Sequence, residues 1–269
     1  MTSRKSDNGD DYQDVPSYIG AMARHYAVGA FEPAHCHPRA QLIFAVSGVM
    51  EISTADRHWL VPPQRALWMP ANLKHEVSRV RTPVEMRTLY VRTADVPVLL
   101  PTQAMLVNVS PLLRELIVRA VELPIEEEIA GAAAQVVALI FNELNFTPVG
   151  DFHLPRVRDP RLGRVEAELL ADPGDTRSIE ELAALAAMSV RTFTRHFQAH
   201  TGLPFSKWRQ QLRLAEAVVR LVNGEAVTTV ALSLGYENVG SFSRMFRRAM
   251  GTSPSDLFQS GRNDDRPPG

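Results

Sequence analysis

Short apolar runs, rich in β-branched and aromatic side chains, fill residues 25–92 and alternate with turn signals such as Pro62-Pro63. Runs of this length between turn-forming residues predict β-strands. Residues 41–46 and 49–53 flank Ser47-Gly48, which predicts a hairpin, and residues 85–91 predict a further strand. Many short strands in succession favour a small antiparallel barrel or sandwich.

The apolar spacing becomes helical after Pro101. A first helix has one apolar face, and a second, over residues 125–146, opens with glutamates that suit the positive end of a helix dipole. The first face comprises Leu112, Leu113, Leu116, Ile117 and Val121. Two interpretations stay open: these helices pack against the barrel or the following domain, or they form a dimer interface.

An internal repeat marks the C-terminal part, which follows a linker rich in proline at residues 148–160. The run Phe193-Thr194-Arg195-His196-Phe197, followed by Gly202, recurs 49 residues later. The second copy is Phe242-Ser243-Arg244-Met245-Phe246, followed by Gly251. A short helical pattern containing alanine precedes each copy, so each predicts a helix-turn-helix unit.

The first unit has clear helix signals. Residues 178–181 read Ser-Ile-Glu-Glu, a capping box, and Ser189 is placed to cap the next helix. Phe193 and Phe197 share one helix face and are expected in the core. The opposite stripe then carries Arg191, Thr194, Arg195 and Gln198, side chains that bind base edges and phosphates.

The second unit repeats this arrangement around Phe242 and Phe246. Its polar residues are Ser241, Ser243, Arg244, Arg247 and Arg248. A long apolar helix over residues 206–221 connects the two units. Rigid spacing would let both recognition helices enter successive major-groove faces, roughly 34–36 Å apart.

Charge is unevenly distributed along the 269 residues, a length that suits two domains. The net charge is −1, but residues 1–155 carry 13 Lys+Arg against 17 Asp+Glu, whereas residues 156–262 carry 15 against 11. A basic C-terminal half suits nucleic acid. The single Cys36 fits a reducing compartment, and no stretch predicts a secretory signal or a membrane span. We therefore expect a cytoplasmic protein.

Residues 178–258 resemble the AraC/XylS family of transcription regulators. The resemblance is carried by Gly235-Tyr236, Ser241-Phe242, Phe246-Arg247-Arg248 and Gly251-Thr252-Ser253-Pro254. It implies two helix-turn-helix units that contact promoter DNA and RNA polymerase, with Arg191, Thr194, Arg195, Ser241, Ser243 and Arg244 as base or phosphate contacts. Val239-Gly240 depart from the polar residues common there, so phosphate anchoring is the expected role of the second helix.

The N-terminal half resembles the cupin barrel through His35-Cys36-His37, Gln41, Gly48, Pro70 and His75. The resemblance implies one divalent transition metal held by His35, His37, Gln41 and His75. Gln41 stands where a carboxylate is usual, which weakens such a site. The alternative is that these residues line an effector pocket, with Phe44, Trp59, Trp68 and Met69 either lining it too or belonging to the core.

The sequence thus predicts an α+β protein. Its parts are a disordered tail (1–15), a cupin-like antiparallel sensor barrel (16–100), a helical dimerisation or packing segment (101–147), the linker, an all-α DNA-binding domain (161–260) and a second tail (261–269). We expect a homodimeric activator or repressor that binds double-stranded promoter DNA and responds to a small molecule or a metal. One alternative is a metal-dependent cupin enzyme with an accessory DNA-binding module, but the sequence offers no separate acid/base pair for catalysis. Another alternative is a regulator that needs no effector and is controlled by its abundance.

Overall fold

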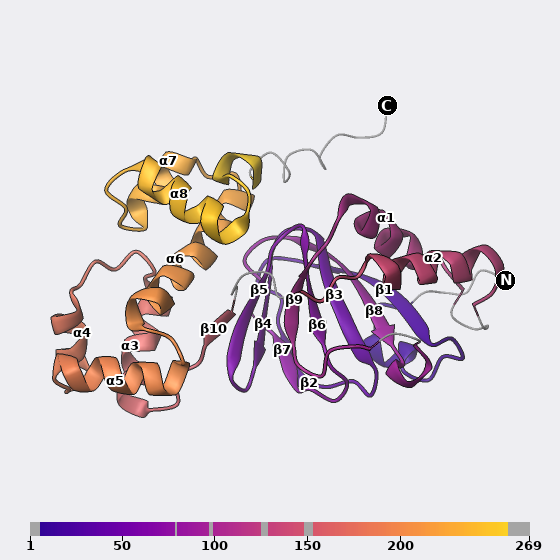
Figure 1. Cartoon of the computed structure of the whole chain (residues 1–269), viewed down its shortest axis with the longest axis horizontal. Helices are drawn as coiled ribbons and strands as arrows, with labels where there is room; N and C mark the ends of the chain where they lie inside the picture. Colours follow the sequence, from indigo (N-terminus) through magenta and orange to yellow (C-terminus); the bar gives the residue numbers. More distant parts are fainter. Residues whose placement is uncertain (1–5, 79, 97–98, 125–128, 148–152, 258–269) are drawn as a thin grey trace. The chain divides into compact units, whose positions relative to one another are not determined.

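The computed structural model describes residues 6–78, 80–96, 99–124, 129–147 and 153–257, and these divide into two compact units. The first comprises residues 1–54 and 61–150, and the second comprises residues 55–60 and 151–269. Figure 1 gives the order of elements along the chain. No described helix is long and apolar enough to cross a membrane.

Two antiparallel five-stranded sheets contain all the described strands. The first has the order β1-β8-β3-β6-β9 and the second the order β10-β5-β4-β7-β2. The strands are β1 (Ile19–Tyr26), β2 (Glu32–His35), β3 (Ala40–Ser47), β4 (Met50–Thr54), β5 (Arg57–Val61), β6 (Arg65–Met69), β7 (His75–Val77), β8 (Val84–Val91), β9 (Met105–Asn108) and β10 (His153–Pro155). The predicted antiparallel architecture is confirmed, as two sheets rather than one closed barrel.

The predicted hairpin at Ser47-Gly48 is wrong. β3 pairs with β6 and β8, whereas β4 pairs with β7 in the other sheet. The chain therefore crosses between sheets at Gly48, which has φ +78°, and a Cβ there would lie 2.1 Å from the backbone oxygen of Pro83. Only glycine combines this conformation with so close a backbone approach.

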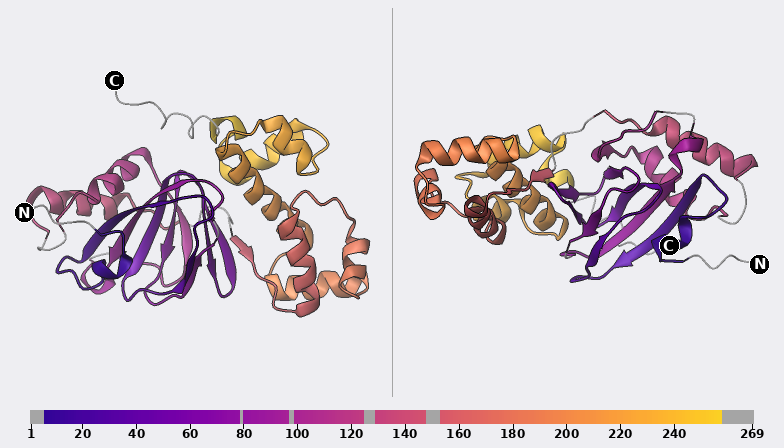
Figure 2. Two further views of the ribbon diagram at one scale, coloured as in Figure 1. Left: turned by 180° about the vertical axis from the view of Figure 1, so that it is seen from behind. Right: turned by 90° about the horizontal axis from the view of Figure 1, so that it is seen from below.

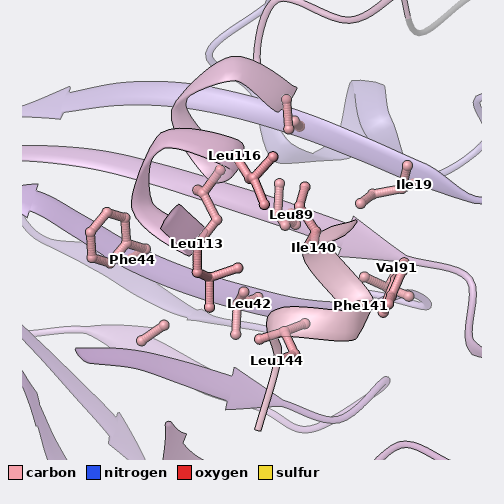
Figure 3. Packing of buried hydrophobic residues seen from close by; sticks show 14 of the residues in the cluster. Ile19, Leu42, Phe44, Leu89, Val91, Leu113, Leu116, Ile140, Phe141 and Leu144 are labelled. Carbon is pink, nitrogen blue, oxygen red and sulfur yellow. The ribbon is translucent and has the colours of Figure 1, made fainter. Parts of the chain in front are cut away.

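Two helices, α1 (Pro111–Ala120) and α2 (Gly131–Glu143), cover the outer face of the first sheet (Figure 2). Leu113 of α1 and Ile140 of α2 are fully buried against Leu42 and Leu89 of the sheet (Figure 3). Ile117 of α1 is fully buried in the same cluster. The packing interpretation of these helices is thus confirmed. α2 is shorter than predicted, and residues 125–128 lie outside the described part.

Three domain boundaries differ from the prediction. Residues 9–12 form a short 3₁₀ helix, η1 (Gly9–Tyr12), inside the predicted N-terminal tail. Tyr12 is fully buried and stacks on Tyr90, with ring centroids 5.9 Å apart, because an aromatic side chain gains free energy by leaving water. β9 extends the first sheet into the predicted helical segment, and β10 occupies part of the predicted linker. Residues 1–5, 148–152 and 258–269 lie outside the described part.

The second unit is helical apart from β10 and residues 57–60 of β5. A further 3₁₀ turn, η2 (Thr93–Asp95), belongs to the first unit. The helices of the second unit are α3 (Pro160–Ala171), α4 (Ile179–Leu185), α5 (Val190–Thr201), α6 (Phe205–Val222), α7 (Val227–Ser233) and α8 (Val239–Met250). They form the two predicted helix-turn-helix units, α4–α5 and α7–α8, with α6 between them (Figure 1).

Candidate DNA interface and effector site

The first helix-turn-helix unit forms as its local signals predict. The hydroxyl of Ser178 accepts a hydrogen bond from the backbone N–H of Glu181, and the Glu181 carboxylate accepts one from the backbone N–H of Ser178. Ser189 caps α5 by accepting from the N–H of Thr192, and Gly202 ends the helix with φ +72°. Caps at both ends fix where the recognition helix begins and ends.

The predicted polar stripe of α5 faces solvent. Arg191, Arg195 and Gln198 are exposed, and Thr194 is half-buried. The Thr194 hydroxyl donates to the backbone oxygens of Val190 and Arg191, 3.0 and 3.2 Å away, so in this rotamer its proton is already used. The two arginines and the glutamine are therefore the free hydrogen-bonding groups of this stripe.

The second recognition helix, α8, lies 49 residues after α5 at both ends and ends at Gly251 with φ +78°. The Asn238 side chain caps it by accepting from the N–H of Ser241. Arg244, Arg247 and Arg248 are exposed, whereas Ser241 and Ser243 are half-buried. The Ser241 hydroxyl donates to the Asn238 backbone oxygen, which leaves the arginines as the groups free to reach DNA.

Four of these arginines have no carboxylate partner within the described residues. Arg191, Arg195, Arg244 and Arg248 form no ion pair there. The charge of Arg247 helps to lower the pKa of the Asp256 carboxyl, after the hydrogen bonds from Ser253 and Thr252. Arg195 and Arg244 stand at matched positions of the two repeated helices, and Arg191 and Arg248 add one further unpaired guanidinium to each helix. Such groups form a surface suited to phosphates and base edges.

Aromatic side chains hold α5 in place. Phe193, Phe197 and Trp208 are fully buried, and Phe197 contacts the rings of Phe205 and Trp208 edge-on, at 5.1 and 5.4 Å. The Trp208 indole N–H donates to the backbone oxygen of Pro155, 3.0 Å away. In the second unit Phe242 and Phe246 are equally buried. Both phenylalanine pairs predicted as core anchors are confirmed in the core.

A groove of about 740 Å³ lies beside α5 and α6. Thr194 and Gln198 line one side of it, and Lys207 and Gln210 of α6 line another. The guanidinium groups of Arg209 and Arg213 also reach the groove but donate to the backbone oxygen of Asp175. Lys207 and Gln210 were not among the predicted DNA-contacting residues. Their polar positions between the apolar residues of α6 are the signal that could have indicated them.

Three histidines converge in the first unit, as the cupin resemblance implied. The ligand nitrogens of His35, His37 and His75 all lie within 4.8 Å of one another. His35 and His75 are paired residues of β2 and β7, and His37 follows the end of β2. His37, Gln41 and His75 are buried, while Cys36 is exposed and points away as expected.

Hydrogen bonds orient two of these rings. Nδ1 of His35 lies 2.8 Å from the Pro33 backbone oxygen, and Nδ1 of His75 lies 2.9 Å from that of Leu73. Because a carbonyl oxygen only accepts, Nδ1 carries the proton in the neutral form of each ring, and Nε2 of that form keeps its lone pair for a ligand. Burial, followed by the neighbouring histidines, lowers the pKa of His37 to about 4, so its ring is neutral at pH 7.

Two buried polar atoms beside the cluster have no hydrogen-bond partner within the described residues: Nδ1 of His37 and Oε1 of Gln41. The Gln41 amide N–H donates weakly to the Tyr90 hydroxyl, at 3.4 Å. An unpaired buried acceptor costs about 1–3 kcal/mol unless a ligand or water satisfies it. Three imidazole nitrogens and an amide oxygen fit a transition metal better than Mg²⁺ or Ca²⁺, which prefer oxygen ligands.

The histidines line a cavity of about 180 Å³. Its wall also contains Glu32, whose carboxylate accepts hydrogen bonds from Arg24 and Tyr26 at 2.9 and 2.7 Å. Burial raises the pKa of the Glu32 carboxyl, but hydrogen bonds from Tyr26 and Arg24 and the charge of Arg24 outweigh burial. The pKa is therefore lowered overall, and the carboxyl stays ionised. Residues 8–10, around η1, also line the cavity. Neither Glu32 nor residues 8–10 were predicted to line a site, because they lie in segments far apart in sequence from the histidines.

The four predicted pocket residues do not line this cavity. Phe44 and Trp68 are buried beneath α1 and α2, on the opposite face of the sheet. Trp59 lies in the second unit, where its ring contacts His153 at 5.1 Å. Met69 is buried next to Gln41 in the register but is not part of the cavity wall. Of the two alternatives left open by the sequence, the core holds for all four residues, which are buried and outside the cavity wall.

Comparison with known proteins gives a consistent picture for both units. Residues 19–138 match a family model described as an AraC-like ligand binding domain, and residues 182–260 match one described as a helix-turn-helix domain. The chain is 32% identical over 222 residues to the HTH-type transcriptional regulator NimR of Escherichia coli (strain K12), covering 82% of this chain and 80% of that protein.

Two further similarities cover the C-terminal part. The HTH-type transcriptional activator RhaS of Escherichia fergusonii is 35% identical over 102 residues, which cover 38% of this chain and 37% of that protein. Among solved structures, the DNA-binding domain of AdpA, described as a global transcriptional factor in complex with a target DNA, is 32% identical; it covers 40% of this chain and 96% of its own, with a TM-score of 0.36.

Proposed function

Because the chain belongs to the AraC family of transcription regulators, we propose that α5 and α8 together read one promoter site while the histidine-lined cavity senses an effector. The observation that carries the DNA half of this proposal is that two helices displaced by 49 residues each carry exposed, unpaired arginines, with Arg195 and Arg244 at matched positions. We propose that Lys207 and Gln210, which line the groove beside α5, bind the phosphate backbone between the two contacted grooves.

The DNA half is tested by measuring affinity for a duplex selected from a random pool, using fluorescence anisotropy at two salt concentrations. We expect Arg195→Ala to weaken binding by about 1–3 kcal/mol, roughly 5- to 150-fold, if the guanidinium reads a base. We expect Arg244→Ala to weaken selected and scrambled duplexes alike, as a phosphate contact would. Arg164→Ala, an exposed arginine of α3, is the control. Full affinity in both variants would contradict the proposed interface.

For the sensor half, we propose that His35, His37 and His75, with Gln41 as a weaker fourth ligand, hold one divalent transition metal or bind a small effector directly. A bound metal would supply an open coordination position for a small molecule within the cavity. The support is the lone-pair orientation of the histidine rings and the two unsatisfied buried atoms. A cavity of about 180 Å³ admits only a small ligand.

The sensor half is tested with His75→Ala in the full chain. We expect this variant to lose the thermal shift that Zn²⁺, Ni²⁺ or a small-molecule panel produces in the wild type, and to lose any effect of that ligand on DNA affinity. His25→Ala, an exposed histidine of β1, is the control. An unaltered response in His75→Ala would remove the histidine cluster from sensing. A wild type that responds to no ligand would favour control by abundance.

We further propose that the chain acts as a homodimer in the cytoplasm, without catalytic activity, and that it contacts RNA polymerase as the family resemblance implies. The support for a dimer is an apolar outer surface on the two helices of the first unit, where Leu112 is 51% and Leu139 46% exposed. Sedimentation of Leu112→Glu/Leu139→Glu is expected to give a monomer where the wild type gives a dimer. Transcription in vitro with purified RNA polymerase tests the proposed contact with the polymerase.

A further inference from the structure

A second group of metal-ligating side chains lies in the DNA-binding unit, on the recognition helix itself. His196 and His200 are one turn apart on α5, so their rings share one side of the helix. Asp159, the N-cap of α3, is the third member. The ligand atoms of these three residues all lie within 4.8 Å of one another. They share no residue with the histidine cluster of the first unit.

This group does not overlap the DNA-reading stripe of α5. At about 100° per residue, His200 lies roughly 180° around the helix from Arg191. It also lies in the last turn of α5, where the helix dipole favours a cation. A ligand bound there would therefore leave the arginines of the stripe free to contact DNA.

The donor set is suited to a transition metal. Two imidazole nitrogens and one carboxylate are a ligand combination that Zn²⁺ accepts, with a water completing a tetrahedron. Metal–ligand distances of about 2.0–2.1 Å bring ligand atoms to roughly 3.4 Å from one another in such a site. The cluster therefore needs to contract by little more than 1 Å. His200 is exposed and His196 is half-buried, so both rings have room to turn.

The Asp159 carboxylate divides its two oxygens between different tasks. Oδ1 caps α3 by accepting from the backbone N–H of Arg161, 2.9 Å away. Oδ2 lies 4.0 Å from Nδ1 of His196 and accepts from the Arg161 guanidinium at 3.2 Å. The Arg161 side chain is 55% exposed and that of Asp159 13%, so the guanidinium can turn into solvent when an ion approaches Oδ2. A divalent ion can thus replace that guanidinium at Oδ2 without disturbing the cap.

We propose that Asp159, His196 and His200 bind one divalent transition metal that joins the C-terminal turn of α5 to the start of α3. The ion fastens the recognition helix to the first helix of the DNA-binding unit. Its role is structural, because it stabilises the position of α5 rather than contacting DNA. This inference goes beyond the proposed sensing function and does not depend on it.

The test measures Co²⁺ stoichiometry in the full-length chain by visible absorption and by metal analysis after gel filtration. We expect Asp159→Asn to bind one equivalent less than the wild type, because an amide still caps α3 but is a poor metal ligand. His200→Gln is expected to lose the same equivalent. The difference of one holds whether or not the histidine cluster of the first unit binds metal, so failure here is distinguishable from failure of the sensor proposal.

Thermal unfolding in Zn²⁺ provides the second readout. We expect Zn²⁺ to raise the unfolding temperature of the DNA-binding unit in the wild type and in the control His25→Gln, and to leave it unchanged in Asp159→Asn and His200→Gln. Equal Co²⁺ stoichiometry in wild type and both site variants would overturn the proposal. A Zn²⁺ shift that persists in both site variants would overturn it as well.

Discussion

Gly48, where the chain crosses from one sheet to the other, allows a sharp comparison with Gly29. Both glycines have positive φ, +78° and +87°. A Cβ at Gly48 would lie 2.1 Å from the Pro83 backbone oxygen, whereas one at Gly29 would meet nothing within 4 Å. Alanine at either position is therefore strained by the left-handed conformation, but only Gly48→Ala also forces two backbone segments apart.

The expected magnitudes follow from these two contributions. A left-handed conformation costs an L-residue about 1–2 kcal/mol, partly offset by the stiffer unfolded chain. Forcing atoms into a packed site typically costs about 1–3 kcal/mol more. We therefore expect Gly48→Ala to be less stable than Gly29→Ala by about 1–3 kcal/mol. For a domain of this size the difference corresponds to roughly 3–9 °C in unfolding temperature.

Scanning calorimetry of the full chain measures this difference. The loss is expected in the transition of the first unit, which contains both glycines, while the transition of the DNA-binding unit stays where it is. Equal unfolding temperatures for the two variants would refute the reasoning, because the close approach to Pro83 would then cost nothing. A shift confined to the DNA-binding unit would refute it too.

Three further predictions concern the DNA-binding unit. Phe197→Ala is expected to lower its free energy of unfolding by about 3–5 kcal/mol in urea, with Phe197→Leu losing much less, because the ring is fully buried. Ser178→Ala should cost about 1 kcal/mol by removing the capping box, and Ser178→Asn should retain most of it. Burial raises the pKa of the Asp175 carboxyl, but the hydrogen bonds and charge of Arg177, together with the charge of Arg209, outweigh burial and lower the pKa overall. The ionised Asp175 carboxylate therefore contributes its full stabilisation above the unfolded pKa of roughly 3.9, and this stabilisation is lost as pH falls towards the folded value. The difference in free energy of unfolding between wild type and Asp175→Asn should thus shrink below about pH 4. A difference that grows on acidification would contradict this prediction.

The DNA-binding unit was predictable because its signals are local. Ser178 and Ser189 specify helix starts through bonds to residues three positions away, and the spacing of Phe193 and Phe197 defines the buried face within one helix. A repeat of the same spacing 49 residues later then predicts a second unit of the same kind. The outward-facing arginines follow from the positions of the buried rings.

The sheet domain was harder to predict because β3 is buried on both faces. Residues 40–45 are all buried, so no alternation distinguishes the face of Gln41 from that of Phe44. Gln41 lines the cavity, whereas Phe44 packs beneath the helices. The hairpin prediction at Gly48 failed for a related reason: a short turn signal does not reveal whether the next strand joins the same sheet.

By itself, the sequence determined the helix-turn-helix repeat and its exposed arginines, because each depends on residue spacing within one short segment. The histidines that meet in the first unit were identified through the resemblance to the cupin barrel, since His75 lies far from His35 and His37 along the chain. Tertiary structure alone decided which strand faces line the cavity, that Glu32 joins it, that Tyr12 is buried, and that Asp159 lies beside His196. Those neighbours are far apart along the chain, and their approach depends on the packing of whole sheets and helices, which local patterns do not encode.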